Sequence, residues 1–256
     1  MEECRTKTPK RIFIGFSSID RHEIVESILH HLANYGISIW YDRYKMRLGD
    51  FYYENFSDGI LNSRYAVLLL SHNIADAKCF SEEMKYVKRQ FDKGLITVFP
   101  ILYKIHPDEL PKQYEWVTNL VYKEINDQSG VLLICNHIMS RFMTDELKNL
   151  RYKTIYDMIY NIGRNKNDSF IEKILSSYLE IDRDNYNARV ALLYSLYCYM
   201  NTTYRIDETY PKHYWRCFER SFSFTKLHLN LDVREILILE LSAMVLINKL
   251  FFEVQL

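Results

Sequence analysis

The sequence of 256 residues has few cysteines, no excess of charge of either sign and little glycine or proline. It contains five cysteines, an odd and scattered set in which no two form a CxxC pair. This argues against a disulfide framework and against a zinc site, so we expect a reducing, cytoplasmic location. Lys and Arg total 33, and Asp and Glu also total 33. The chain therefore has no net charge that would attract nucleic acid or an anionic membrane.

The sequence also has no long apolar run. Residues 236–252 form the most apolar late stretch, but Glu240 and Lys249 interrupt it. Nothing approaches the roughly 20 residues that a membrane span requires. The first 11 residues, MEECRTKTPKR, lack the apolar core of a secretory signal. We therefore expect a protein that is neither secreted nor inserted in a membrane.

Glycine and proline are scarce and lie mostly in the first half. Six of the seven glycines and four of the five prolines occur at or before residue 130. Because these residues mark turns, the first half should contain many short elements and the second half few. The change predicts two domains, at 9–143 and 146–256.

Short apolar runs alternate with amphipathic stretches in the first half. The runs typical of buried strands are residues 11–16, 37–41, 65–70 and 95–103, with a fifth at 119–123. Helices are predicted between them, including 51–62 and 80–93, and a closing helix at 131–142. This alternation predicts an α/β domain with a parallel sheet covered by helices on both faces.

From about residue 146 the apolar spacing is helical throughout. The predicted helices are 147–162, 168–182, 186–203, 211–228 and 232–253. Leucine, tyrosine and methionine at helical spacing, as around 192–200, are typical of packed helix faces rather than of a ligand site. The second half is therefore predicted to be all-α.

Three blocks of the first half resemble the Toll/interleukin receptor (TIR) domain in their order and spacing. They are RIFIGFSSID at 11–20, GISIWYD at 36–42 with the loop up to Phe51, and SRYAVLLLS at 63–71 with AKCFSEEMKYV at 77–87. The resemblance covers about residues 9–143. It implies a flavodoxin-like fold, a five-stranded parallel sheet with helices on both faces, followed here by the helical domain.

The resemblance also implies an activity. Catalytic members of the family cleave NAD+ between nicotinamide and ribose, and some cyclise the remaining ADP-ribose. NAD+ is then the substrate, and neither a cofactor nor a metal is implied. Nicotinamide is already a cationic leaving group, so the reaction needs mainly a positioned carboxylate and a site that limits water. The family further implies a homo-oligomer whose assembly gates activity, and a setting in anti-phage defence or immune signalling.

Helical geometry distinguishes two neighbouring glutamates of the third block. The apolar residues of this helix share one face: Phe80, Met84, Val87 and Phe91. At about 100° per residue, Glu83 lies about 60° from Phe80 at the border of that face, whereas Glu82 points nearly opposite. By the resemblance of residues 77–87 to the TIR motif, Glu83 also occupies the position of the family's catalytic glutamate. The residues alone favour an ordinary boundary carboxylate paired with a neighbouring lysine, and it is the resemblance that leads us to expect Glu83 to be catalytic.

The resemblance implies further substrate-binding residues. They are Phe16, Ser17, Ser18, Asp42, Lys45, Phe51 and Cys79. The first three follow the first strand, at the sheet edge where open parallel sheets bind ligands. Cys79 stands where many enzymatic members carry a tryptophan that offers a stacking surface. Phe80 is the candidate to replace that surface.

Two other interpretations stay open. The chain is a noncatalytic TIR interaction module that binds other TIR domains through the loop 43–51, an interpretation that Cys79 favours. Alternatively, it is a flavodoxin-like receiver or resembles a nucleoside deoxyribosyltransferase. A receiver should carry an acidic pair after its first strand, and only Asp20 stands there. No GxGxxG, GxxxxGK[ST] or HExxH motif occurs, which argues against standard dinucleotide, P-loop and zinc-protease sites.

Overall fold

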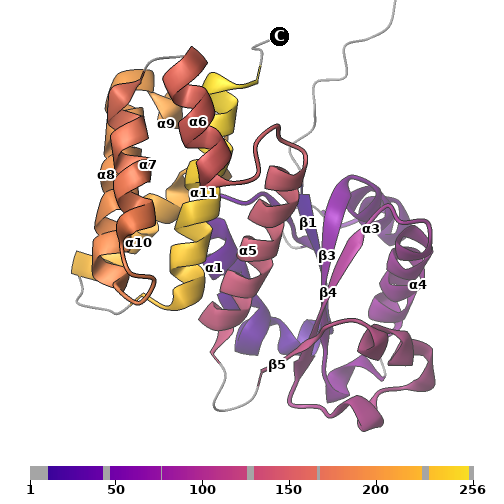
Figure 1. Ribbon diagram of the computed structural model, residues 1–256. Coiled ribbons are helices and arrows are strands. Elements are labelled where there is room, and N and C mark those ends of the chain that lie inside the picture. The colour runs from indigo at the N-terminus through magenta and orange to yellow at the C-terminus, as the bar shows by residue number, and fades with distance from the viewer. Residues whose placement is uncertain are drawn as a thin grey trace, which may run out of the picture. The chain divides into compact units, whose positions relative to one another are not determined.

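The computed structural model describes residues 11–42, 47–75, 77–125, 130–165, 168–226 and 231–253. The chain forms two compact units (Figure 1). The first, here called the α/β unit, runs to Cys135 apart from Asn34–Gly36. Those three residues belong to the second, the helical unit, with the chain from Asn136 onward. The division lies inside helix α5 (Val131–Lys148), and the domain boundary expected at 143–146 stays a prediction.

Five parallel strands form the sheet of the α/β unit. They are β1 (Arg11–Gly15), β2 (Ile39–Trp40), β3 (Ser63–Leu70), β4 (Thr97–Tyr103) and β5 (Lys123–Ile125). Their order across the sheet is β2-β1-β3-β4-β5. The predicted parallel five-stranded α/β fold is confirmed. The fifth strand begins at Lys123 rather than at Asn119, because Lys112–Asn119 form a 3-10 helix.

Helices cover both faces of this sheet. A π-helical turn (Arg21–Val25) leads into α1 (Glu26–Asn34), which lies on one face. On the other face lie α3 (Tyr52–Leu61) and α4 (Lys78–Asp92), to the right of the strands in Figure 1. The chain passes from β1 to the neighbouring edge strand β2 and then returns to β3 on the other side of β1. The order of the strands therefore reverses between β1 and β3, and ligands bind at such a point in open parallel sheets.

The core of the α/β unit lies between the sheet and the pair α3 and α4. Its aromatic residues include Phe13, Trp40, Phe56 and Phe80. Gly59 lets α3 approach the sheet closely, because a Cβ there would stand 2.5 Å from the Trp40 ring. Phe80 is only 1% exposed, and its ring centroid is 5.6 Å from that of Tyr114. The expectation that Phe80 supplies a stacking surface is wrong, because packing turns its ring into the core.

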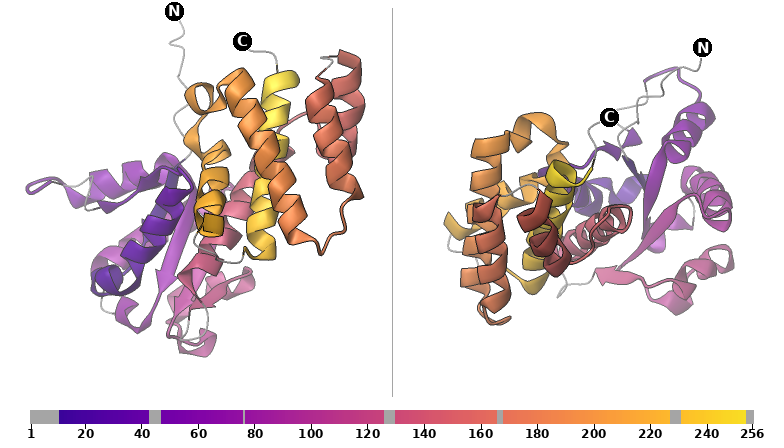
Figure 2. Two further views of the ribbon diagram at one scale, coloured as in Figure 1. Left: turned by 90° about the vertical axis from the view of Figure 1, so that its left-hand side faces the viewer. Right: turned by 45° about the horizontal axis from the view of Figure 1, so that its top comes forward.

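Six helices after α5 are described in the helical unit. They are α6 (Ile155–Asn165), α7 (Ser169–Glu180), α8 (Tyr186–Tyr204), α9 (Ile206–Thr209), α10 (Arg216–Lys226) and α11 (Val233–Phe251). Helix α11 packs against α6, α8 and α10, and Figure 2 shows α8 and α11 alongside one another. Among the described residues, none of the helices combines the length and apolar character that crossing a membrane requires.

The helix predicted at 147–162 is interrupted. The chain leaves α5 after Lys148 and resumes helix at Ile155. Between them, the Asn248 side chain accepts a hydrogen bond from the Tyr152 backbone N–H (3.0 Å) and donates one to its carbonyl (2.9 Å). Both backbone groups of Tyr152 thus bind α11 instead of continuing a helix. The sequence pattern missed this break because the partner lies 96 positions away.

Candidate active site

Glu83 lies at the carboxyl end of β1, on the face of α4 that covers the sheet. The side chain is buried, with 8% of the residue exposed. Its Oε1 accepts a 2.6 Å hydrogen bond from the Tyr52 hydroxyl. Its Oε2 lies beside Gly15, the last residue of β1, at 3.5 Å from the position that a Cβ of this glycine would occupy. The carboxylate is therefore held between a helix and the strand end where the sheet order reverses.

Burial determines the protonation of Glu83. Loss of contact with water raises the pKa of Glu83 to about 8; the hydrogen bond from Tyr52 opposes this rise, and the negative charge of Asp42 adds to it. The pKa of Tyr52 is raised as well, first by burial and then by the charge of Glu83. Tyr52 thus remains a neutral donor. A carboxyl group whose pKa is near neutrality is present in both its protonated and its ionised form at physiological pH, as is common for catalytic groups.

Glu82 has a different environment. Its side chain is half-exposed and accepts a 2.7 Å hydrogen bond from Lys85, one helical turn away. The predicted distinction between a solvated Glu82 and a Glu83 that borders the apolar face is confirmed. The catalytic role expected for Glu83 stays a prediction.

Gly15 leaves room for the carboxylate. A Cβ at this position would lie 3.1 Å from Cδ2 of Leu68 and 3.3 Å from the Phe13 ring, in addition to its contact with Glu83. These distances are tighter than ordinary van der Waals contacts. A larger residue would crowd Leu68 and Phe13 and would fill the space beside the carboxylate of Glu83, and nothing in the sequence pattern singles out this glycine.

The residues after β1 differ in exposure. Phe16 is buried and stacks on Tyr41, with ring centroids 5.9 Å apart. Ser17 is buried, and its carbonyl accepts a 2.9 Å hydrogen bond from the Asp20 backbone. Ser18 is exposed. Phe16 and Ser17 are thus packed into the protein directly after Gly15, while Ser18 faces solvent.

Asp42 forms an ion pair that the sequence did not reveal. Its two carboxylate oxygens accept hydrogen bonds of 2.8 and 2.6 Å from Arg21. Arg21 also donates to the Tyr41 hydroxyl (2.7 Å), and its guanidinium lies over the rings of Phe16 and Tyr41. A bidentate pair of this kind fixes geometry strongly. Arg21 therefore holds the end of β2 against the segment that follows β1.

A second polar cluster joins the ends of β1 and β3. Asp20 is fully buried and accepts 2.6 Å hydrogen bonds from the Ser71 hydroxyl and from the Asn73 amide. The one signal for this cluster in the sequence is the presence of polar residues shortly after two strands, 51 positions apart at Asp20 and Ser71. Asp20 thus fixes the two loops that flank the point where the sheet order reverses.

The remaining candidate residues lie around α3 and α4. Phe51 precedes α3 and is 75% exposed. Cys79 is an exposed free thiol in the first turn of α4, close enough to the Tyr52 hydroxyl to interact with it. Lys45 lies outside the described residues. In the part of the chain that is described, no three His, Cys, Asp or Glu side chains gather to hold a metal ion.

Sequence comparison identifies the domain that carries this site. Residues 12–130 match the TIR domain family. This part of the chain is a TIR domain. Glu83, Tyr52, Gly15 and the two polar clusters all lie within the matched residues of the TIR domain.

Several curated bacterial proteins are similar to the TIR domain. The 2′ cyclic ADP-D-ribose synthase BtTIR of Bacteroides thetaiotaomicron is 26% identical over 98 residues, 38% of this chain and 34% of the relative. The NAD(+) hydrolase PdTIR of Paracoccus denitrificans (strain Pd 1222) is 28% identical over 102 residues, 40% of this chain and 34% of the relative. The chain thus spans about a third of the length of these relatives. Among solved structures, the TIR domains of the activated Roq1 resistosome are 16% identical over 52% of this chain and 99% of theirs, with a TM-score of 0.46.

Proposed function

We propose that this chain cleaves NAD+ at the bond between nicotinamide and ribose, with Glu83 as the catalytic carboxylate. The observation that carries the proposal is the burial of Glu83 between Tyr52 and Gly15, at the sheet edge where a ligand is expected. Relatives that are named NAD(+) hydrolase and 2′ cyclic ADP-D-ribose synthase support the choice of substrate.

The chemistry follows from a carboxylate in a poorly solvated place. The bond from the ribose C1′ to the nicotinamide nitrogen breaks, and its electron pair leaves with neutral nicotinamide. Positive charge then develops on the ribose ring, and ionised Glu83 stabilises it more strongly than it would in water. In hydrolysis a water oxygen bonds to C1′ and releases its proton. In cyclisation a hydroxyl of the ADP-ribose takes the place of that water.

Other residues are proposed to hold the substrate or the carboxylate. Tyr52 keeps the carboxylate of Glu83 in place and favours its ionised form through the 2.6 Å hydrogen bond. The residues proposed to line the substrate's path remain Phe16, Ser17, Ser18, Asp42, Lys45, Phe51 and Cys79. Because Phe80 is in the core, exposed Phe51 is the aromatic residue of this set that is available for stacking on a base.

Self-assembly is proposed to gate the activity. Leu48 is fully exposed and Phe51 and Tyr53 are largely exposed, all at or just before the start of α3. Contiguous exposed apolar side chains commonly mark a protein interface, and these three lie within six positions of the chain. A second copy that covers them would also exclude water near Glu83. Assembly in an immune response that kills or arrests infected cells is the biological setting we propose.

The test is release of nicotinamide from NAD+ by the purified full chain over a range of protein concentrations. We expect release that rises more steeply than in proportion to protein, and chromatography of the products separates ADP-ribose from a cyclic isomer. Deoxynucleosides in place of NAD+ should yield no free base. Absence of nicotinamide release at every concentration, with and without a crowding agent, would contradict the proposal.

The second candidate function is a noncatalytic module that binds other TIR domains. Two observations favour it: an exposed cysteine stands in place of a stacking tryptophan, and Phe80 does not replace that tryptophan. This candidate predicts concentration-dependent association without nicotinamide release. Replacing Leu48 and Phe51 by Ser would then abolish association while leaving NAD+ untouched in every sample.

A further inference from the structure

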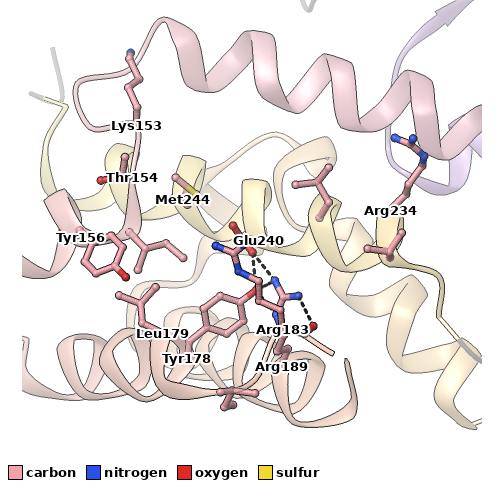
Figure 3. Close-up of a pocket in the computed structure, with 14 residues that line it drawn as sticks. Lys153, Thr154, Tyr156, Tyr178, Leu179, Arg183, Arg189, Arg234, Glu240 and Met244 are labelled. Atoms are coloured by element: carbon pink, nitrogen blue, oxygen red, sulfur yellow. Dashed lines mark hydrogen bonds and ion pairs between the residues drawn. The ribbon is translucent and has the colours of Figure 1, made fainter. Parts of the chain in front are cut away.

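The helical unit contains a cavity of about 710 Å³ that is independent of the proposed NAD+ site. Residues before and within α6, at the end of α7, in α8 and along α11 line it (Figure 3). Small-molecule sites commonly occupy roughly 300–1,000 Å³. The cavity therefore has the size of a ligand site, and its charged groups indicate what kind of ligand it accepts.

The cavity has a single acidic lining residue among those described, Glu240, and this charge is neutralised. Its Oε2 accepts hydrogen bonds from Arg189 (2.9 Å) and from the Tyr178 hydroxyl (2.6 Å). Arg189 also donates two hydrogen bonds to Tyr178 and lies over its ring. The dashed lines in Figure 3 show this cluster at the centre of the view. Glu240, Arg189 and Tyr178 thus form hydrogen bonds with one another, and their charges sum to zero.

Lys153 is also committed to partners within the protein. Its ammonium donates hydrogen bonds to the carbonyls of Leu147 (3.1 Å), Lys148 (2.7 Å) and Leu150. These carbonyls lie at and just beyond the end of α5, where a cation offsets the negative end of the helix dipole. Lys153 therefore stabilises the end of α5, and its N–H groups are taken up by backbone carbonyls, although its positive charge remains.

Two arginines of the lining remain. Arg183 follows α7 and is exposed, and Arg234 begins α11 and is half-exposed. Neither guanidinium has an ion pair within the described part of the chain. Figure 3 shows them apart, with Arg234 at the other end of the cavity from Lys153. With Lys153 included, the described lining residues carry an excess of three positive charges, two of them on Arg183 and Arg234, and Glu240 is the acidic residue among them.

The remaining walls are largely apolar. They include Ile155, Leu179, Val233, Leu237 and Met244. Val233 and Leu237 remain partly open to solvent, on the side of α11 that faces the cavity. An apolar wall favours a hydrocarbon or aromatic body, and the planar guanidinium favours a carboxylate, sulfonate or phosphate group.

We propose that this cavity binds a small organic anion, with its apolar body against α11 and its negative group paired with Arg183 or Arg234. The binding site lies entirely within the helical unit. A ligand of this class is therefore bound without any contribution from Glu83 or from NAD+.

The test uses two probes that differ in a single charge. 8-Anilinonaphthalene-1-sulfonate carries the sulfonate, and N-phenyl-1-naphthylamine is the same aromatic body without it. Each is titrated into the full chain and followed by fluorescence, with calorimetry for the stoichiometry. We expect one sulfonate probe per chain, bound at least about tenfold more tightly than the neutral probe, as one charge-assisted hydrogen bond allows.

Variants locate the binding. The double change Arg183→Gln and Arg234→Gln should weaken the sulfonate probe about tenfold or more and leave the neutral probe unchanged. Leu237→Glu should abolish binding of the sulfonate probe, because it places a negative charge on the apolar wall. Arg216→Gln is the matched control, a half-exposed arginine of α10 outside the cavity, and should change nothing. Circular dichroism shows whether each variant retains its helices.

Two results would overturn the proposal. Equal affinity for both probes would mean that the cavity does not select an anion. An unchanged affinity of the sulfonate probe in both the double variant and Leu237→Glu would place its binding elsewhere on the chain.

Discussion

The Tyr52 hydroxyl donates a 2.6 Å hydrogen bond to Oε1 of Glu83, joining the first turn of α3 to α4. Burial disfavours the charge on Glu83, and this hydrogen bond partly restores it. The two effects together set the pKa of a carboxyl that would otherwise ionise well below neutrality. The contact between Tyr52 and Glu83 therefore helps to determine the pH range in which the proposed reaction is fast.

The pH dependence of NAD+ cleavage should report the pKa of Glu83. With a pKa of about 8 in the free protein, Glu83 is largely protonated at pH 7 and ionises as the pH rises. We expect kcat/KM to increase between about pH 6 and 9 with a midpoint near 8, because only the ionised form stabilises a cationic ribose. Initial rates of nicotinamide release at low NAD+ measure this. A profile that is flat or falls over this range would contradict the role given to the carboxylate.

Tyr52→Phe should move this profile to higher pH. The variant loses the hydrogen bond that favours ionised Glu83, an interaction with a charged group worth about 1.5–3 kcal/mol. We expect the midpoint to rise by about one unit and the rate at pH 7 to fall about tenfold, with partial recovery toward pH 9. Tyr186→Phe is the control, since Tyr186 is exposed at the start of α8 in the helical unit. A loss of rate that is the same at every pH would mean that Tyr52 acts in another way.

Glu83→Gln should change stability as well as activity. The pKa of Glu83 is raised on folding, so its contribution to stability is complete below about pH 4.5 and is lost as the pH rises toward 8. Glutamine does not ionise, so the stability of the variant does not fall in this way as the pH rises. We expect it to unfold like the parent near pH 5 and to be more stable above pH 8, by about 5 kcal/mol at most.

Urea unfolding at the two pH values measures the difference. Glu82→Gln provides the comparison, because Glu82 is paired with Lys85 at the surface and should change stability by about 0.5 kcal/mol or less at either pH. Equal stability of the parent and Glu83→Gln above pH 8 would show that burial does not raise the pKa of Glu83.

A buried ion pair should stabilise the helical unit. Arg220 donates a 3.1 Å hydrogen bond to Glu235, and the Arg220 guanidinium lies over the Tyr35 ring. Arg220→Leu leaves Glu235 buried without its partner, which costs about 3–5 kcal/mol. Removing the charge as well, with Glu235→Gln, should recover a large part of this loss. Thermal unfolding tests both, and Glu208→Gln, at an exposed pair with Arg205, should cost less than about 1 kcal/mol.

The sequence predicted those features that depend on local periodicity. The apolar face of α4 was enough to separate Glu83 from Glu82, because helical geometry fixes the direction of each side chain. The alternation of strands and helices likewise predicted the parallel sheet. The helix at 186–203 was predicted to within one residue at its end.

Features that depend on distant contacts were missed. Tyr52 carries no local sign that its hydroxyl reaches Glu83, 31 positions later. The same holds for Arg21 and Asp42, and for the break at Tyr152, where Asn248 competes with the helix for backbone hydrogen bonds. The position of Phe80 beside Cys79 suggests a stacking surface, because the sequence alone does not show the core that encloses its ring.

The most direct test of the account compares Glu83→Gln with Glu82→Gln for nicotinamide release from NAD+, at a protein concentration where the parent chain is active. Both changes replace one carboxyl group by an amide in the same turn of α4, but only Glu83 lies beside Gly15. We expect Glu82→Gln to retain the parent rate within about twofold and Glu83→Gln to lose at least about a hundredfold, as removal of a group that stabilises transition-state charge does. Equal rates for the two variants would contradict the assignment of Glu83 as the catalytic carboxylate.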